Sequence, residues 1–268
     1  MRLFSIHLGY VLGALPFAER FARARQLGFR AVEMPFPYTV AADDYAGLLA
    51  RNGLRQISIG APTGDYRKGE TGYAVDPSLR AEFTRSLEQA ADYATRIGAP
   101  AVHIFSGCRN PQLPAAAAEE TYRENLATAA ALLAERGIMT LIEPINPTDF
   151  PGYHLDSLDA ALGTIAAVGD GRIRLIFDLY HLRMTGKDPV AALHAAHRHI
   201  EHIQFADFPG RHEPGSGTFD FAAIIAAMRA VSYDRSAGLE YIPTRGPNEP
   251  LVLPAALAGY AALAPADA

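Results

Sequence analysis

Short apolar runs and stretches of helical spacing alternate along the whole chain. Residues 3–8 form an apolar run, and apolar residues then recur near helical spacing at Phe17, Phe21 and Ala24 before Gly28. The first pattern is typical of a buried strand, and the second predicts an amphipathic helix that ends at a glycine. We expect strands at residues 3–8, 29–33, 54–59, 101–105, 138–143, 172–178, 200–205 and 236–241. We expect helices at residues 16–27, 41–52, 77–97, 115–136, 156–168, 189–198, 219–230 and 251–263.

This order predicts an α/β fold of eight strands that alternate with eight helices. The strands are apolar without a clean alternation, as in parallel sheets that are buried on both faces. Eight strand–helix units in 268 residues favour a closed (β/α)8 TIM barrel over an open doubly wound sheet, and we expect residues 1–268 to form a single domain. Dinucleotide and P-loop folds are disfavoured, because no GxGxxG follows the first strand and no GxxxxGKS or GxxxxGKT is present.

The composition is that of an ordinary globular protein. With 49% hydrophobic residues, a net charge of −5 and a pI near 6.0, the chain lacks the basic character of a nucleic-acid binder. No apolar run reaches about 18 residues, so we expect no membrane span. Polar residues interrupt the apolar start, which favours a first strand over a signal peptide. Cys108 is the single cysteine and excludes an intrachain disulfide, so we expect a cytoplasmic protein.

Oxygen-bearing side chains end four consecutive expected strands. Glu143, Asp178, Gln204 and Glu240 are the last or next-to-last residues of the fifth to eighth strands. The strands of such a barrel form the active site at their carboxyl ends, so we expect these side chains to converge on one cation. Taken singly, each carboxylate fits a helix cap or an ion pair as well. Together, three carboxylates and one amide favour Mg²⁺ or Mn²⁺ over Zn²⁺, which prefers His or Cys ligands.

Several ordered stretches carry a resemblance to a known family. They are Leu-Ile-Glu-Pro-Ile-Asn at 141–146, Pro-Gly-Tyr at 151–153, Phe-Asp-Leu-Tyr-His at 177–181, His-Ile-Gln-Phe-Ala-Asp at 202–207, Pro-Gly-Arg-His-Glu-Pro-Gly at 209–215 and Gly-Leu-Glu-Tyr at 238–241. In these stretches the chain resembles the hydroxypyruvate isomerase family, and the resemblance extends over most of the chain. This family belongs to the xylose-isomerase-like TIM barrels and includes 2-oxo-tetronate isomerases.

The resemblance implies roles for the four strand-end residues. It implies that Glu143, Asp178, Gln204 and Glu240 bind the metal, and that Glu143 and Glu240 form the proton donor and acceptor pair. The related ketose 3-epimerases usually have His where Gln204 stands, so the amide fits the isomerase branch. The chemistry agrees, because two carboxylates can move a proton between neighbouring carbons while a cation stabilises the enediolate. Which glutamate acts as the base stays open.

Three further polar residues near these strand ends are candidates for the site. His181 follows Asp178 by three residues and suits a substrate oxygen, although a capping or core histidine fits as well. Arg211 lies in a glycine-rich loop, where its guanidinium suits a substrate carboxylate; a solvated loop arginine is the alternative. Asp207 is expected to orient Gln204 or Arg211.

Polar residues in the first and third strand regions are weaker candidates. His7, near the end of the first strand, is expected to line the pocket or to be a buried structural histidine. Lys68 and Glu70 lie in the long loop 60–75, either as part of a lid or as solvated residues. A group of four histidines is interpreted mostly as surface or structural, because their positions face different ways. The group consists of His194, His197, His199 and His202.

The expected activity is a metal-assisted aldose–ketose isomerisation of a small 2-oxo acid through an enediolate. The leading substrate pair is hydroxypyruvate and tartronate semialdehyde. A 2-oxo-tetronate isomerase or a ketose 3-epimerase is the alternative, and a non-catalytic sugar-binding barrel is a more distant one. A barrel-fold DNA repair endonuclease is disfavoured, because it needs several His ligands and a basic groove. We expect a small-molecule substrate as partner, no nucleic acid and no membrane, and the sequence is compatible with a homo-oligomer.

Overall fold

The computed structural model describes residues 3–65 and 70–262, which fall into two compact units. The first unit comprises Met1–Met34, Asp44–Ile57 and Phe177–Ala268, and the second comprises Pro35–Asp43 and Ser58–Ile176. The chain passes from the second unit to the first within one strand, β7 (Ile173–Asp178). The organisation as one domain stays a prediction.

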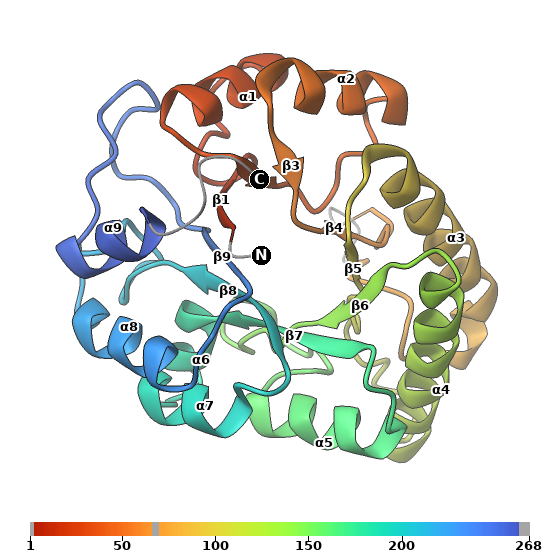
Figure 1. The fold of residues 1–268 in the computed structure, drawn as a ribbon. Helices are drawn as coiled ribbons and strands as arrows, with labels where there is room; N and C mark the ends of the chain where they lie inside the picture. Colours follow the sequence, from red (N-terminus) through yellow and green to blue (C-terminus); the bar gives the residue numbers. More distant parts are fainter. Residues whose placement is uncertain (1–2, 66–69, 263–268) are drawn as a thin grey trace. The chain divides into compact units, whose positions relative to one another are not determined.

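Parallel strands form the centre of the first unit. Their order is β3 (Arg55–Gln56), β2 (Ala31–Glu33), β1 (Phe4–His7), β9 (Ser236–Leu239) and β8 (Ile200–Phe205). The helices of this unit are α1 (Phe17–Gln26), α2 (Ala42–Asn52), α6 (Leu179–Met184), α7 (Pro189–Ala196), α8 (Phe221–Ala230) and α9 (Ala255–Ala261). Helices α7, α8 and α9 lie along one side of β8 and β9 (Figure 1).

The second unit repeats the plan with fewer elements. Its strands run in parallel in the order β7, β6 (Met139–Ile142), β5 (Ala101–His103) and β4 (Ile59–Gly60). Its helices are α3 (Arg80–Ile97), α4 (Ala115–Ala134) and α5 (Leu158–Val168), preceded by the 3₁₀ turn Pro77–Leu79. These helices lie along one side of the strands (Figure 1). Among the described helices, none is both long and apolar enough to cross a membrane.

Apolar residues of the strands hold each unit together. In the first unit, the ring of Phe4 packs against the rings of Phe29, Phe205 and Tyr260, with centroids 5.9 Å, 6.3 Å and 6.4 Å away. Burying one such ring stabilises the fold by about 2 kcal/mol. In the second unit, the core contains Leu141 with neighbouring strand residues. The apolar runs of the sequence therefore form the strands that anchor both units.

The predicted strand and helix order is largely confirmed, with three differences. The expected strand 54–59 is two short strands, because β3 pairs with β2 whereas β4 pairs with β5. The expected helix at 77–97 opens with a 3₁₀ turn, which Asp76 caps by accepting a hydrogen bond from Ser78 N. Helix α6 was not expected, since its six residues directly follow a strand and are too few for a helical pattern.

Candidate active site

The carboxyl ends of four strands in the first unit carry buried polar side chains. Strands β1, β2, β8 and β9 are parallel, and their register pairs His7 with Glu33 and Gln204 with Gly238. Parallel strands present their carboxyl ends at one edge of a sheet. His7, Glu33, Gln204 and Glu240 are all buried there. Side chains from distant parts of the sequence thus meet at this edge.

Arg211 binds two of the predicted ligands at once. Its Nη2 donates to Asp178 Oδ2 at 2.7 Å and to Glu240 Oε1 at 2.8 Å. The guanidinium carbon lies 4.9 Å and 5.4 Å from the ring centroids of Tyr10 and Tyr180. Only 6% of Arg211 is exposed, so it is not the solvated loop arginine considered as an alternative. The single charge of the buried guanidinium offsets part of the repulsion between these two carboxyl groups.

Asp207 closes the loop that carries Arg211. Its Oδ1 accepts hydrogen bonds from Phe208 N at 2.8 Å and Phe219 N at 3.1 Å, and its Oδ2 accepts one from Gly215 N at 2.8 Å. These bonds tie both ends of the loop to one buried carboxylate. Asp207 therefore stabilises the loop that carries Arg211, and its role in orienting Arg211 stays a prediction.

Asp178 uses its two oxygens differently. Oδ1 caps helix α6 by accepting hydrogen bonds from Tyr180 N at 2.7 Å and His181 N at 3.2 Å. Oδ2 accepts the bond from Arg211 and lies 3.8 Å from His181 Nε2. Asp178 is therefore a helix cap and a member of the polar cluster at the same time. Asp178 and His181 offer a carboxylate oxygen and a ring nitrogen to a shared ligand.

The amide of Gln204 lies between two carboxylates. Its Nε2 donates to Glu33 Oε2 at 2.8 Å and also to Glu240 Oε2. Its Oε1 is buried, and no residue in the described part of the chain donates a hydrogen bond to it. A buried carbonyl oxygen without a donor is costly unless a ligand such as a cation uses it.

Glu33 belongs to the same cluster, and sequence reasoning missed it. Ser5 Oγ donates to its Oε1 at 2.6 Å, and His202 Nε2 lies 3.0 Å from its Oε2. Burial alone would raise the pKa of Glu33, but His202, His7 and Ser5 lower it to about 2. The signal was present, because residues 29–33 are an apolar run that ends in a carboxylate. His202 is fully buried, whereas His194 of the same histidine group is exposed.

Burial dominates the protonation of Glu240. It raises the pKa of this carboxyl above its usual range, and the charges of Asp178 and Glu33 raise it further. Arg211 and the hydrogen bond from Gln204 act in the opposite direction. The cluster therefore holds more carboxylates than its own donors can neutralise, and an added cation would favour their ionised forms.

His7 is held as a neutral donor. Its Nδ1 accepts hydrogen bonds from Gly9 N at 3.0 Å and Tyr10 N at 2.9 Å, which places the ring proton on Nε2. Within the described residues, Nε2 has no hydrogen-bond partner. Burial lowers the pKa of His7 to about 4; the charge of Glu33 opposes this shift and Arg211 adds to it. A neutral Nε2–H is thus offered to a ligand oxygen.

Glu143 is buried in the second unit, where it directly follows β6. His103 Nδ1, at the end of β5, lies 3.7 Å from Glu143 Oε2, and the His103 ring packs against Phe105 with centroids 3.9 Å apart. Tyr153 Oη accepts a hydrogen bond from Ser106 N at 3.1 Å. Burial raises the pKa of Tyr153, and the charge of Glu143 raises it too. Sequence reasoning missed His103, because it lies in the middle of the apolar run 101–105 and does not end it as the predicted ligands end theirs.

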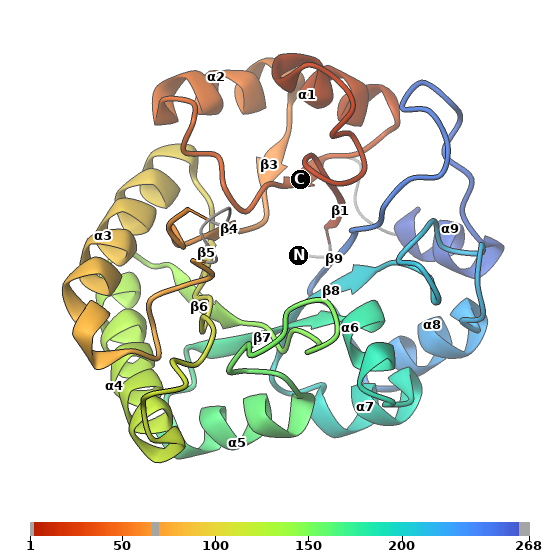
Figure 2. The same cartoon turned by 180° about the vertical axis from the view of Figure 1, so that it is seen from behind.

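The loop of residues 144–154 pairs with the loop after β5. Cys108 and Tyr153 form an antiparallel bridge, and His154 N donates to Gly107 O at 2.9 Å. The loop runs in front of β7 in the view of Figure 2. The backbone bonds fix its path beside Glu143.

The long loop after β4 contains two of the weaker candidates. Glu70 is exposed, and its Oε2 accepts a hydrogen bond from Asp65 N at 2.6 Å within the same loop. This contact agrees with a solvated loop residue. Lys68 lies outside the described residues.

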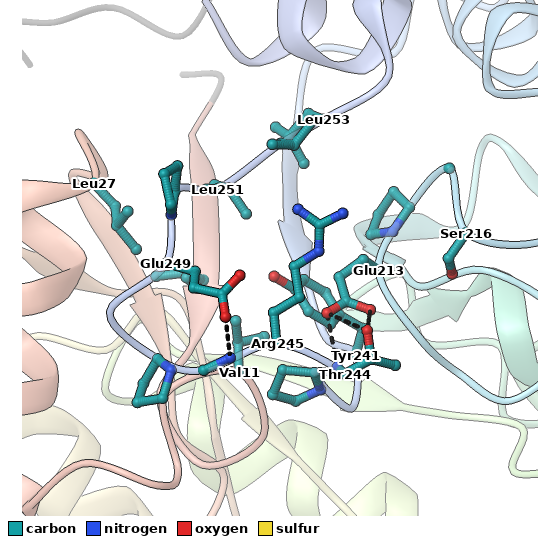
Figure 3. A pocket seen from close by; sticks show the side chains of 18 of the residues that line it. Val11, Leu27, Glu213, Ser216, Tyr241, Thr244, Arg245, Glu249, Leu251 and Leu253 are labelled. Atoms are coloured by element: carbon teal, nitrogen blue, oxygen red, sulfur yellow. Dashed lines mark hydrogen bonds between the residues drawn. The ribbon is translucent and has the colours of Figure 1, made fainter.

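A cavity of about 450 Å³ lies in the first unit away from the predicted ligands (Figure 3). Its apolar walls include Val11, Leu27 and Leu251, and the side chain of Arg245 reaches into it. None of the four predicted metal ligands lines this cavity.

The donor set of the first unit fits a hard divalent cation. Asp178 and Glu240 supply carboxylate oxygens, and Gln204 Oε1 supplies a buried carbonyl oxygen that no described donor uses. Carboxylate and carbonyl oxygens are the usual ligands of Mg²⁺ and Mn²⁺. The residues present thus match the cation expected from the sequence.

Comparison with known proteins finds TIM barrels and isomerases that are similar to this chain over most of its length. The sequence profile described as "Xylose isomerase-like TIM barrel" matches residues 21–260. The 2-oxo-tetronate isomerase of Cupriavidus necator is 37% identical over 92% of this chain and 95% of its own length. The hydroxypyruvate isomerase of Escherichia coli is 34% identical over 91% of this chain and 94% of its own length. A crystal structure described as an AP endonuclease, family 2, from Brucella melitensis has a TM-score of 0.91 and 32% identity, covering 97% of this chain and 99% of that one.

The chain therefore belongs to the xylose isomerase-like TIM barrel family. The fold class predicted from the alternating strands and helices is confirmed. The resemblance to hydroxypyruvate isomerases and 2-oxo-tetronate isomerases is confirmed over most of the chain. Both curated relatives are isomerases, and the expectation that this chain is an isomerase is confirmed with them.

Proposed function

We propose that the chain interconverts hydroxypyruvate and tartronate semialdehyde in a reaction assisted by a divalent cation. The observation that carries the proposal is the buried cluster of the first unit. There Arg211 bridges Asp178 and Glu240, and Gln204 presents an unused carbonyl oxygen among the described residues. Such a cluster suits a small, negatively charged oxo compound and a hard cation.

Four residues would hold the cation, which we expect to be Mg²⁺ or Mn²⁺. They are Asp178, Gln204 and Glu240 from the first unit and Glu143 from the second. Support for including Glu143 comes from its buried position directly after a strand of a TIM barrel, where ligands of such barrels lie. When bound, the cation would stabilise the negative charge that develops on the substrate oxygens.

Glu143 and Glu240 would carry out the proton transfer. One carboxylate removes a proton from C3 of hydroxypyruvate, which leaves an enediolate, and the other delivers a proton to C2. The hydroxyl proton on O3 passes to O2, so the product is an aldehyde with a 2-hydroxyl group and no atom is gained or lost. Both carboxylates are buried, which keeps bulk water from competing for the proton.

Arg211, His7 and His181 would bind the substrate. The carboxylate of a 2-oxo acid matches the fork of donors on Arg211, and a cation on Asp178 and Glu240 would compete for the oxygens that Arg211 now binds. His7 Nε2–H suits a substrate hydroxyl or carbonyl oxygen, since its Nδ1 is already used. His181 lies next to Asp178 and suits a neighbouring oxygen.

A 2-oxo-tetronate isomerase is the alternative, supported by the 37% identity to the Cupriavidus enzyme. A panel of hydroxypyruvate, 2-oxo-tetronates and free ketoses, assayed with Mg²⁺ or Mn²⁺ in deuterated water, separates the candidates. Turnover of hydroxypyruvate with deuterium in the product supports the proposal. Faster turnover of a four-carbon acid would favour the alternative. Cation binding without deuterium incorporation into any of these compounds would favour a non-catalytic sugar-binding barrel.

An endonuclease activity, named for the Brucella structure, fits the chain less well. The chain carries a net charge of −5, and binding to the phosphate backbone of DNA needs basic residues. The buried cluster offers mainly carboxylates and an amide, with His181 beside Asp178, whereas zinc sites are usually built from several His or Cys ligands. Cleavage of abasic DNA is the matching assay, and we expect none. The cytoplasmic location and a homo-oligomeric state stay predictions.

A further inference from the structure

The orientation of the Gln204 amide is set by its neighbours. The acceptors of its Nε2 are oxygens of Glu33 and Glu240. Glu33 is ionised and only accepts hydrogen bonds, so the nitrogen of the amide has to face Glu33. Its Oε1 then points away from both carboxylates, which is the orientation that a metal-binding carbonyl requires. Glu240 is itself a proposed ligand, whereas Glu33 has no part in the proposed function.

Glu33 is held in place from two sides. Ser5 Oγ donates to Oε1 at 2.6 Å, and His202 Nε2 lies 3.0 Å from Oε2, the oxygen that also accepts from Gln204. His202 lies two residues before Gln204 in β8, so both side chains emerge on one face of the strand. The other ring nitrogen of His202 is 2.8 Å from Ser236 Oγ, which turns Nε2 toward Glu33.

The backbone leaves space for this arrangement. Gly238 of β9 is the register partner of both Ser5 and Gln204. A Cβ atom at Gly238 would lie 2.1 Å from Glu33 Oε1 and 2.1 Å from Ser5 Oγ, far inside van der Waals contact. The sheet therefore lacks a side chain at the position where the carboxylate of Glu33 enters. This observation is independent of the hydrogen bonds and points to the same residue.

We infer that Glu33 is a positioning residue that fixes the Gln204 amide with Oε1 turned toward a divalent cation. The inference rests on the proposed function, because it assumes that Gln204 is a ligand. An amide can flip and present its nitrogen, which does not bind a metal ion, in place of its oxygen. The bond to Glu33 selects the orientation of Gln204 that binds metal. The orienting partner of a ligand typically changes metal affinity by 10–100-fold when it is lost.

Mn²⁺ binding, followed by the electron paramagnetic resonance signal of free Mn²⁺, tests this role without any assay of turnover. Glu33→Gln should raise the Kd for Mn²⁺ by about 10–100-fold. Glu201→Gln is the matched control: Glu201 lies on the same strand and pairs with Arg235 instead. Its Kd should equal that of the unchanged protein. An unchanged Kd in folded Glu33→Gln would overturn the inference.

A second pair of variants separates positioning from a purely structural role. In Gln204→Glu the new carboxylate faces Glu33 and cannot donate a hydrogen bond. When Glu33→Gln is added to Gln204→Glu, the residue at position 33 donates the hydrogen bond and the residue at position 204 accepts it. In the Gln204→Glu protein, Glu33→Gln should therefore lower the Kd for Mn²⁺. Equal weakening in both backgrounds would show that Glu33 acts independently of Gln204 and would overturn the inference.

Two outcomes keep this inference apart from the proposed function. If the unchanged protein binds no Mn²⁺ or Mg²⁺, the proposed function fails and the inference fails with it. If the unchanged protein binds Mn²⁺ and Glu33→Gln binds equally well, only the inference fails. Should Glu33→Gln not fold, Ser5→Ala takes its place, because it removes one bond that holds Glu33. It should raise the Kd several-fold, and an unchanged Kd would count against the inference.

Discussion

Glu240 and Glu143, the two carboxylates of the proposed proton transfer, are buried in chemically different surroundings. Glu240 accepts hydrogen bonds from Arg211 and Gln204, neither of which gives up a proton near neutral pH. Glu143 instead lies 3.7 Å from the ring of His103. In the first unit the carboxylate thus accepts hydrogen bonds from a guanidinium and an amide, whereas in the second unit the carboxylate lies beside an imidazole ring.

The difference indicates distinct roles for the two glutamates in cation binding and proton transfer. A carboxylate held by a guanidinium and an amide keeps its position, and a bound cation would favour its ionised form, which suits a residue that binds a cation. A carboxylate beside an imidazole can pass a proton on, which suits exchange with solvent or product. We therefore expect variants of the two glutamates, and of their neighbours, to change different measured quantities: turnover, KM, metal affinity or stability.

Replacing either glutamate gives the largest expected effect. Glu240→Gln and Glu143→Gln each keep the shape of the side chain but cannot accept a proton, so kcat should fall by about 10²–10⁴-fold. Turnover of hydroxypyruvate and deuterium incorporation from solvent measure this, with circular dichroism to show that the fold is retained. Normal turnover in either variant would contradict the shared proton transfer and leave one of the two environments without a catalytic role.

Arg211 gives the next largest effect, because its guanidinium binds both Asp178 and Glu240. Lysine is a point charge and cannot reproduce the fork that reaches a carboxylate in two places. Arg211→Lys should therefore raise the KM for hydroxypyruvate by about 10–100-fold, as expected for loss of a charged hydrogen bond. Arg211→Gln removes a competitor for Asp178 and Glu240 and should lower the Kd for Mn²⁺.

The control for this pair is Arg183→Lys. Arg183 lies over the ring of Phe208 at 5.5 Å and is exposed, so KM and the Mn²⁺ Kd should stay unchanged. If Arg211→Lys also leaves KM unchanged, Arg211 serves the folded cluster and not the substrate.

The sequence was sufficient for the order of most strands and helices and for the residues at the strand ends. Apolar runs separated by helical spacing predict the order of strands and helices, because burial of apolar side chains determines both patterns. The same rule, that an apolar run ends in a polar residue, places Glu143, Asp178, Gln204 and Glu240 at strand ends. The rule also covers Glu33, which ends the apolar run 29–33. Glu33 was missed because only the last four strands were considered as sources of ligands.

Partner choice within the cluster could not be predicted. Gln204 and Glu33 are 171 residues apart in sequence, and their contact depends on the register of β8, β9, β1 and β2. A shift of one residue would turn either side chain to the other face. Arg211 is likewise aimed by a loop in which it adopts φ 58°, a conformation that side-chain-bearing residues rarely take and that a sequence pattern does not reveal.

The protonation of His7 should make the stability of the protein depend on pH, because burial and the nearby charge of Arg211 make a second positive charge there unfavourable. Its pKa is about 4 in the folded protein and 6.5 in the unfolded chain, so the unfolded chain binds more protons between these values. Stability should therefore fall as pH falls from about 6.5 to 4. Between pH 7 and 4.5 the loss due to His7 should be roughly 2 kcal/mol. Urea unfolding of His7→Gln, compared with the unchanged protein, should show a shallower loss over this window; parallel curves would contradict the neutral state of His7.

The smallest expected effect concerns Tyr153, an uncharged residue of the loop that follows Glu143. Tyr153 Oη accepts a hydrogen bond from Ser106 N, so Tyr153→Phe leaves a buried donor unpaired and should lower the free energy of unfolding by about 1 kcal/mol. Tyr122 is equally buried, but its hydroxyl has no hydrogen-bond partner within the described residues. Tyr122→Phe should therefore be neutral or slightly stabilising. Equal losses in both variants, measured by urea unfolding, would mean that the Ser106 bond contributes nothing, and that packing alone holds the loop beside Glu143.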